Sequence, residues 1–94
     1  MLYLPWMKTV EIHIKGKVQG VGYRYSALYK ATVLGIQGYV KNNYDSTVTI
    51  VAEGEEEKLD EFVIWCHNGP SHAIVESVTV TDTEPSHRKT FKIK

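Results

Sequence analysis

The spacing of apolar residues changes from a period of two to a helical period across one short glycine-rich segment. Apolar and polar residues alternate over residues 8–16, which predicts a half-buried strand. Three glycines lie within residues 16–22, and residues 23–34 then hold neither glycine nor proline and present one apolar helix face. The sequence therefore predicts a strand, a tight connection and a helix in direct succession.

Two short runs with the composition of strands follow, after Gly35, which is placed to end the helix. The runs cover residues 36–43 and 47–53, and the three residues between them are typical of a hairpin turn. Gly54 interrupts the second run, so we expect the strand to end there. This part of the chain predicts a tight antiparallel hairpin.

A second amphipathic helix is predicted after the hairpin. The run Glu55–Glu57 stands at its start, where the positive end of the helix dipole favours negative charge, so we interpret it as a solvated helix start rather than a metal site. Apolar residues then recur at the i, i+3, i+4 and i+7 spacing of one helix face: Leu59, Phe62, Val63 and Cys66. Residues 68–70, Asn-Gly-Pro, end the pattern.

The order of elements predicts the fold class. Residues 74–83 alternate again, and residues 90–94 form a last short strand. The order strand, helix, strand, strand, helix, strand is that of the α+β ferredoxin-like split βαβ sandwich, in which two helices cover one face of an antiparallel sheet. Right-handed crossovers place the first and third strands side by side in the middle. We expect residues 8–94 to form this single domain, and residues 1–7 to be a loose extension.

Composition narrows the functional classes. The chain has 11 basic and 11 acidic residues, and this balance argues against a nucleic-acid partner. The apolar residues 1–7 are too few to span a membrane, and they lack the flanks of a signal peptide. A single cysteine excludes an internal disulfide and suits a reducing compartment. We therefore expect a cytoplasmic protein that contacts neither nucleic acid nor a membrane, and we also expect a monomer, although these features do not by themselves set the oligomeric state.

No residues have the spacing of a metal site or of a cysteine nucleophile. Cys66 lies on the apolar face of the second predicted helix, so a buried structural thiol is expected. The four histidines are scattered along the chain without ligand spacing: His13, His67, His72 and His87. We expect neither a metal nor another cofactor.

The glycine-rich connection has the chemistry of an anion site. It runs into a helix N-terminus, where backbone N–H groups lack partners and the dipole is positive. Arg24 follows at the start of that helix, and its guanidinium can bond two phosphate oxygens at once. The loop has neither the GxGxxG order nor the GK[ST] ending of nucleotide loops. From these residues alone, a phosphate or carboxylate site and a plain glycine-rich turn remain equally open.

Two motifs resemble those of the acylphosphatase family. Residues 16–24, GKVQGVGYR, resemble the signature G-x-V-Q-G-V-x-[F/Y]-R, and residues 34–42, LGIQGYVKN, resemble L-G-[aliphatic]-x-G-[aromatic]-V-x-N. The likeness covers residues 8–94. Ser46 stands where the hairpin glycine is usual, so a different turn type is expected, and Ala27 stands where many members carry a hydroxyl residue.

The resemblance implies an activity and a set of site residues. The activity is hydrolysis of the carboxyl-phosphate bond of a small acyl phosphate, such as acetyl phosphate, carbamoyl phosphate or 1,3-bisphosphoglycerate, without a metal. Arg24 and Asn42 would be catalytic, Arg24 on the phosphoryl oxygens and Asn42 on the attacking water. The phosphate-binding loop would consist of Gln19, Gly20, Val21, Gly22, Tyr23 and Arg24.

The alternative is a non-catalytic ferredoxin-like module that binds an anion or an acyl phosphate, because a fold does not fix a function. Asn42 separates the two hypotheses. When composition alone is considered, Asn42 and the adjacent Asn43 are explained as residues that favour a hairpin turn. A binding module has no need to position a water molecule, whereas a hydrolase does.

Overall fold

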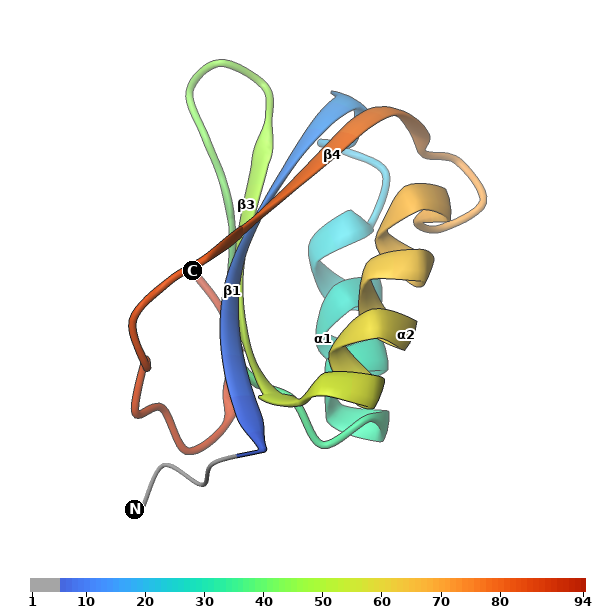
Figure 1. Ribbon diagram of the computed structural model, residues 1–94. Helices are drawn as coiled ribbons and strands as arrows, with labels where there is room; N and C mark the ends of the chain where they lie inside the picture. Colours follow the sequence, from blue (N-terminus) through green and yellow to red (C-terminus); the bar gives the residue numbers. More distant parts are fainter. Residues whose placement is uncertain (1–5) are drawn as a thin grey trace.

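A computed structural model of the protein describes residues 6–94, in which five strands and two helices alternate (Figure 1). In chain order these are β1 (Met7–Lys17), α1 (Tyr23–Val33), β2 (Gln37–Asn42), β3 (Val48–Glu55), α2 (Glu56–Asn68), β4 (Ile74–Asp82) and β5 (Phe91–Ile93). The expected loose extension falls on residues 1–7, of which residues 1–5 lie outside the described part of the chain, while Met7 already begins β1.

The strands form one sheet in the order β4-β1-β3-β2-β5, and both helices cover the same face of it (Figure 1). β1 and β3 lie side by side in the middle, as predicted, with Ile12 opposite Ile50 in an antiparallel register. The split βαβ sandwich predicted from the order of elements is confirmed. The short β5 adds parallel to β2, so the sheet is mixed rather than wholly antiparallel.

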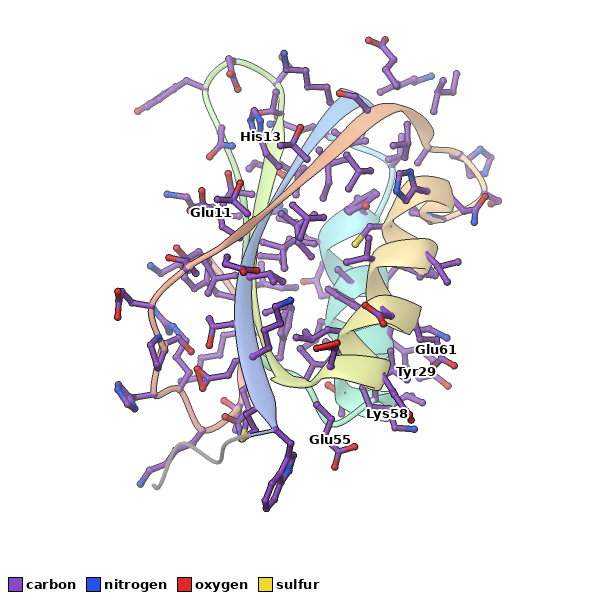
Figure 2. All side chains as sticks on the ribbon, in the orientation of Figure 1. Glu11, His13, Tyr29, Glu55, Lys58 and Glu61 are labelled. Carbon is purple, nitrogen blue, oxygen red and sulfur yellow. The ribbon has the colours of Figure 1, made fainter. Side chains whose placement is uncertain are left out.

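The core lies between the sheet and the two helices. Val10, Ile12 and Ile14 of β1 are buried, and Phe62 of α2 is fully enclosed. Burying such a side chain stabilises a fold by about 1.5–3 kcal/mol. The alternate residues of β1 lie on the other side of the sheet, and Figure 2 shows His13 there, away from the helix layer. The period of two in residues 8–16 therefore separates a core face from an outer face.

One expectation about the hairpin region was wrong. Gly54 does not end β3, because it still pairs with Lys8 of β1, and α2 begins directly after Glu55. A paired neighbouring strand keeps the glycine extended in spite of its freedom. In the turn, Ser46 takes a φ of 74° in the left-handed region, and the different turn type expected there stays a prediction.

The segment between β4 and β5 is tied to the sheet through a buried carboxylate. Oε1 of Glu53 accepts hydrogen bonds from the Ser86 backbone N–H at 2.7 Å and from Thr9 Oγ1 at 3.0 Å. Beyond this segment the chain returns along β2, where the Lys94 N–H donates to the Val40 carbonyl at 2.8 Å. Within residues 6–94, no helix is long and apolar enough to cross a membrane.

Candidate active site

The loop between β1 and α1 leads into the start of a helix that no side chain caps. Gly20 and Gly22 have φ values of 73° and 80°, and Gly22 is the residue from which α1 starts. These left-handed conformations favour glycine and let successive N–H groups turn toward one side. No side chain caps α1, and no acidic residue lies in its first turn. The positive end of the helix is therefore available to an anion.

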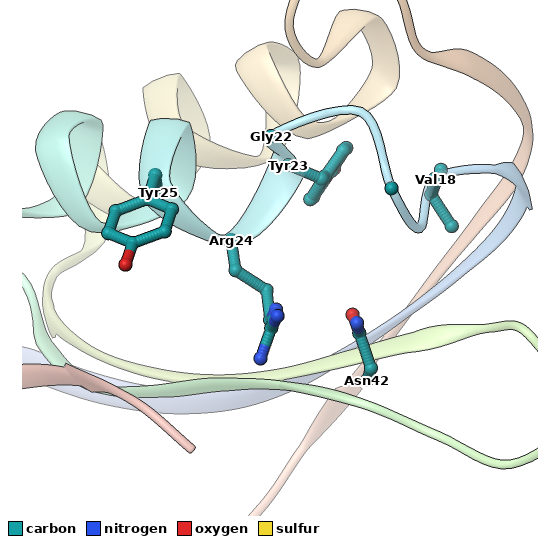
Figure 3. A pocket seen from close by; sticks show the side chains of 7 residues that line it. Val18, Gly22, Tyr23, Arg24, Tyr25 and Asn42 are labelled. Carbon is teal, nitrogen blue, oxygen red and sulfur yellow. The ribbon is translucent and has the colours of Figure 1, made fainter.

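The loop and the end of β2 enclose one cavity of about 250 Å³. Five of the residues predicted from the sequence line it together: Gly20, Gly22, Tyr23, Arg24 and Asn42. Figure 3 shows the side chains of Arg24 and Asn42 extending into the space beneath the loop. Two further lining residues, Val18 and Tyr25, were missed by the sequence analysis. The sequence feature that could have identified them is their position, since Val18 lies inside the first motif and Tyr25 directly follows it.

Arg24 is oriented by the returning chain end. Its Nη1 donates to the Lys94 carbonyl at 3.3 Å, and Lys94 is itself hydrogen-bonded to β2. One of the five guanidinium N–H groups is thus used for positioning, which leaves others for an anion. The link brings the start of α1, the end of β5 and the end of β2 to one place. The sequence analysis predicted Arg24 as a site residue but did not predict its hydrogen bond to the Lys94 carbonyl.

Asn42 lines the cavity and carries a buried acceptor that has no hydrogen-bond partner among the described residues. The residue closes β2, where it pairs with Val48 of β3. This acceptor is the side-chain oxygen Oδ1. Leaving such an oxygen unpaired costs about 1–3 kcal/mol. A water molecule that donates to Oδ1 would remove that cost, which makes this side chain suited to hold a water.

The Gln19 side chain braces the loop against the hairpin and does not line the cavity. Its Nε2 donates to the carbonyls of Asn43 and Thr47, each at 2.9 Å. Those two residues close the turn, since the Asn43 N–H also donates to the Thr47 carbonyl at 2.9 Å. The loop is therefore fixed to the strand that carries Asn42. Val21 likewise packs against the core rather than lining the cavity.

A polar network around Thr47 stiffens the hairpin. The Thr47 hydroxyl donates to Asp45 Oδ1 at 2.5 Å and accepts from Asn43 Nδ2 at 2.9 Å. A hydroxyl has one hydrogen, so the 3.0 Å contact with His13 Nε2 requires His13 to be the donor. The hydrogen bonds from the Thr47 hydroxyl and N–H lower the pKa of Asp45.

The Tyr23 hydroxyl and the Cys66 thiol are not suited to nucleophilic chemistry near neutral pH. Burial raises the pKa of Tyr23, whose hydroxyl donates to the Cys66 carbonyl at 2.8 Å. Burial also raises the pKa of the Cys66 thiol to about 12, and the thiol is fully enclosed, as predicted. Among residues 6–94, no three His, Cys, Asp or Glu side chains are grouped to hold a metal ion.

Comparison with known proteins gives a consistent result. A family model described as Acylphosphatase matches residues 10–93. The acylphosphatase of Trichormus variabilis is 42% identical over 92 residues, covering 96% of this chain and 91% of the relative. That of Thermococcus kodakarensis is 42% identical over 89 residues, covering 93% and 98%.

Solved structures agree with these relatives. The crystal structure of acylphosphatase from Bacillus subtilis superposes with a TM-score of 0.89 at 35% identity, over 94% of this chain and 98% of that one. The structure of an acylphosphatase from Coxiella burnetii gives 0.91 at 31% identity, over 94% and 93%. The chain therefore belongs to the acylphosphatase family, whose enzymes hydrolyse acyl phosphates.

Proposed function

We propose that this chain hydrolyses the carboxyl-phosphate bond of a small acyl phosphate at the cavity beneath the β1–α1 loop. The observation that carries the proposal is that Arg24 and Asn42 share this cavity with the uncapped start of α1. A cation and a helix end suit the phosphoryl group, and an unpaired amide oxygen suits a water molecule. A non-catalytic binding module would need the cation and the helix end but not the unpaired amide oxygen.

The phosphoryl group is held by backbone and guanidinium donors. The N–H groups of residues 19–24 point their dipoles at the phosphoryl oxygens, and Arg24 binds two of these oxygens. Negative charge spreads over the oxygens as the transition state forms, so these fixed donors gain strength during the reaction. Gln19 supports the same step through its side-chain hydrogen bonds to the hairpin.

Asn42 orients the attacking water. Its Oδ1 accepts one hydrogen of the water, whose oxygen then attacks phosphorus in line with the leaving carboxylate. The bond between phosphorus and the carboxylate oxygen breaks, and the carboxylate leaves with the electron pair. The proton of the water passes to a phosphate oxygen, because a neutral amide is a poor base. A carboxylate leaves readily without protonation, so positioning and charge stabilisation supply most of the catalysis.

We also infer that the chain acts as a cytoplasmic monomer without a metal or organic cofactor, and that it binds neither nucleic acid nor a membrane. The balanced charge of the chain and the buried free thiol of Cys66 support this setting. Size-exclusion chromatography with light scattering, together with activity in the presence of a chelator, tests the oligomeric state and the independence from metal.

The test of the function is release of inorganic phosphate from acetyl phosphate by the purified chain. The wild type is expected to turn over, and Arg24→Ala is expected to lose at least about a hundredfold in kcat/KM and to bind phosphate more weakly. Arg88→Ala is the matched control and is expected to keep the wild-type activity. Arg88 does not line the cavity, and its guanidinium stacks on the Tyr39 ring, 4.7 Å from the ring centroid. Phosphate binding without turnover would favour the binding module, and full activity of Arg24→Ala would refute the site.

A further inference from the structure

The end of α2 leaves one backbone carbonyl that the helix itself cannot satisfy. Gly69 follows α2, and its N–H donates to the Trp65 carbonyl at 2.8 Å, four residues back. The next carbonyl, that of Cys66, would take its hydrogen bond from residue 70, which is Pro70 and has no N–H. A buried carbonyl without a partner is costly, so this helix end needs a donor from elsewhere in the fold.

Tyr23 supplies that donor from the start of α1. Its hydroxyl donates to the Cys66 carbonyl at 2.8 Å, and the residue is only 1% exposed. The ring also lies 5.3 Å from Trp65 between centroids, at an angle of 49°. One buried side chain therefore joins the first residue of α1 to the last turn of α2.

Gly69 lies against the edge of the same ring. An added Cβ at this position would lie 2.7 Å from Cε2 of Tyr23, closer than real Cβ atoms approach their neighbours. The ring would have to move, and because it is enclosed, it could move only by straining its hydrogen bond to the Cys66 carbonyl. The absence of a side chain at residue 69 therefore helps to set where the Tyr23 ring lies.

Tyr23 also begins the part of α1 that faces the phosphate cavity. The first hydrogen bond of α1 joins the Ser26 N–H to the Gly22 carbonyl at 3.1 Å, so the N–H groups of residues 23–25 have no partner inside the helix. Tyr23 and Arg24 both line the cavity, and Figure 3 shows them where the loop enters α1. A shift of the Tyr23 ring would therefore displace donors that the proposed function assigns to the phosphoryl group.

We propose that Tyr23 is a positioning residue, whose side chain, set by Gly69 and by the Cys66 carbonyl, holds the start of α1 in the geometry that binds phosphate. The inference rests on the proposed function, because it takes the phosphoryl group to bind at these N–H groups and at Arg24. Positioning of this kind matters because a misplacement of about 1 Å can cost about a hundredfold in rate. The end of α2 thus supports the phosphate site without touching the substrate.

The test compares Gly69→Ala with Gly35→Ala in the full chain. Each glycine follows the end of a helix with a left-handed φ, 65° and 70°, so both variants carry a similar backbone strain. An added Cβ at Gly35 meets nothing within 4 Å, which makes Gly35→Ala the matched control. Gly69→Ala is expected to raise the Kd of inorganic phosphate, measured by calorimetry, about tenfold and to lower kcat/KM for acetyl phosphate at least as much. Gly35→Ala is expected to keep both quantities within about twofold of the wild type.

Tyr23→Phe is a milder variant, which decides the question if Gly69→Ala does not fold. It keeps the ring and removes only the hydrogen bond to the Cys66 carbonyl. The Kd of inorganic phosphate is expected to rise about threefold, because the start of α1 loses one of its fixed contacts. Tyr29→Phe is the control, since it removes an exposed hydroxyl from the same helix and is expected to leave the Kd unchanged.

Phosphate binding needs no turnover, so it separates failure of this inference from failure of the proposed function. A wild type that binds phosphate but releases none from acetyl phosphate would refute the hydrolase and leave the Kd comparison valid. Equal Kd values in Gly69→Ala and Gly35→Ala, or an unchanged Kd in Tyr23→Phe, would overturn the positioning role of Tyr23 and leave the hydrolase proposal intact.

Discussion

At the scale of single residues, Gln19 carries a role that its motif position does not reveal. The resemblance placed Gln19 in the phosphate-binding loop, and the structure shows that its side chain also fixes this loop to the hairpin through two 2.9 Å hydrogen bonds. A sequence motif indicates which residues recur together but not which of their atoms face the ligand. The side-chain partners lie 24 and 28 residues away along the chain, beyond the reach of local pattern reasoning.

Gln19→Met keeps the length of the side chain and removes both donated hydrogen bonds. The free energy of unfolding is expected to fall by about 1–3 kcal/mol, because the Asn43 and Thr47 carbonyls each lose the hydrogen bond from Gln19, although Thr47 keeps the one from the Asn43 N–H. For a domain of this size each kcal/mol corresponds to about 4–8 °C in Tm. Thermal unfolding by circular dichroism measures the change. A Tm equal to that of the wild type would show that the two side-chain hydrogen bonds of Gln19 contribute nothing to stability.

Gly38 lies where neighbouring backbone leaves no room for a side chain. Its φ is 139°, and an added Cβ would meet the Val51 carbonyl oxygen. Gly38→Ala is expected to lower the free energy of unfolding by at least about 2 kcal/mol. Gly54→Ala is the control, since its Cβ would lie 3.4 Å from Ile36 Cγ1, an ordinary contact. Urea unfolding compares the two, and equal stabilities would contradict the steric account.

At the scale of elements, most of the secondary structure follows from periodicity. The predicted helices and strands match the observed ones closely, and in β1, β3 and both helices the pattern follows the buried residues, since burial fixes the period. The break expected at Gly54 was wrong because pairing with β1 overrides the local preference of glycine. The parallel pairing of β5 with β2 follows a segment that Ser86 ties to Glu53, and no local pattern encodes either contact.

The hydrogen bonds around Thr47 in the hairpin determine how the Asp45 carboxyl is expected to titrate. Thr47 lowers the pKa of Asp45 below its ordinary value of 3.8. A lowered pKa means that the carboxylate stabilises the fold above about pH 4 and that this contribution is lost as the pH falls through the lower folded pKa. Thr47→Val removes the hydroxyl hydrogen bond and keeps the one from the backbone N–H, so the Asp45 carboxyl is expected to titrate closer to 3.8. NMR titration of the Asp45 carboxyl carbon measures it.

Thr81→Val serves as the control for this titration, because Thr81 is an exposed threonine on β4 at a distance from the turn. It is expected to leave the titration of Asp45 unchanged. A wild-type midpoint at 3.8, or the same shift in both variants, would show that Thr47 does not set the charge state of the turn.

At the scale of the whole molecule, topology assembles the site. The order β4-β1-β3-β2-β5 brings the loop after β1, the end of β2 and the end of β5 together, although they are far apart in the chain. The sequence predicted Arg24 and Asn42 through the resemblance, and the strand order then explains why they share one cavity. Tyr25 and the Lys94 carbonyl could not be predicted, because their roles arise only from packing.

The buried thiol reports on the stability of the whole core. Because Cys66 is enclosed, an aromatic disulfide reagent is expected to label it only as fast as the protein unfolds. Its pKa of about 12 exceeds the ordinary value of 9.0, so its contribution to stability is full below about pH 9 and is lost as the pH rises toward 12. Rapid stoichiometric labelling of the native protein at pH 8 would contradict this placement.

The most direct test of the proposed mechanism is to measure turnover and phosphate binding in Asn42→Ala. We predict that kcat for acetyl phosphate falls by about a hundredfold or more, because the attacking water loses its acceptor. We predict that the Kd of inorganic phosphate, measured by calorimetry, stays within about threefold of the wild-type value, because the loop and Arg24 remain. An unchanged kcat, or a loss of phosphate binding as large as the loss of turnover, would contradict the assignment of Asn42 to the water.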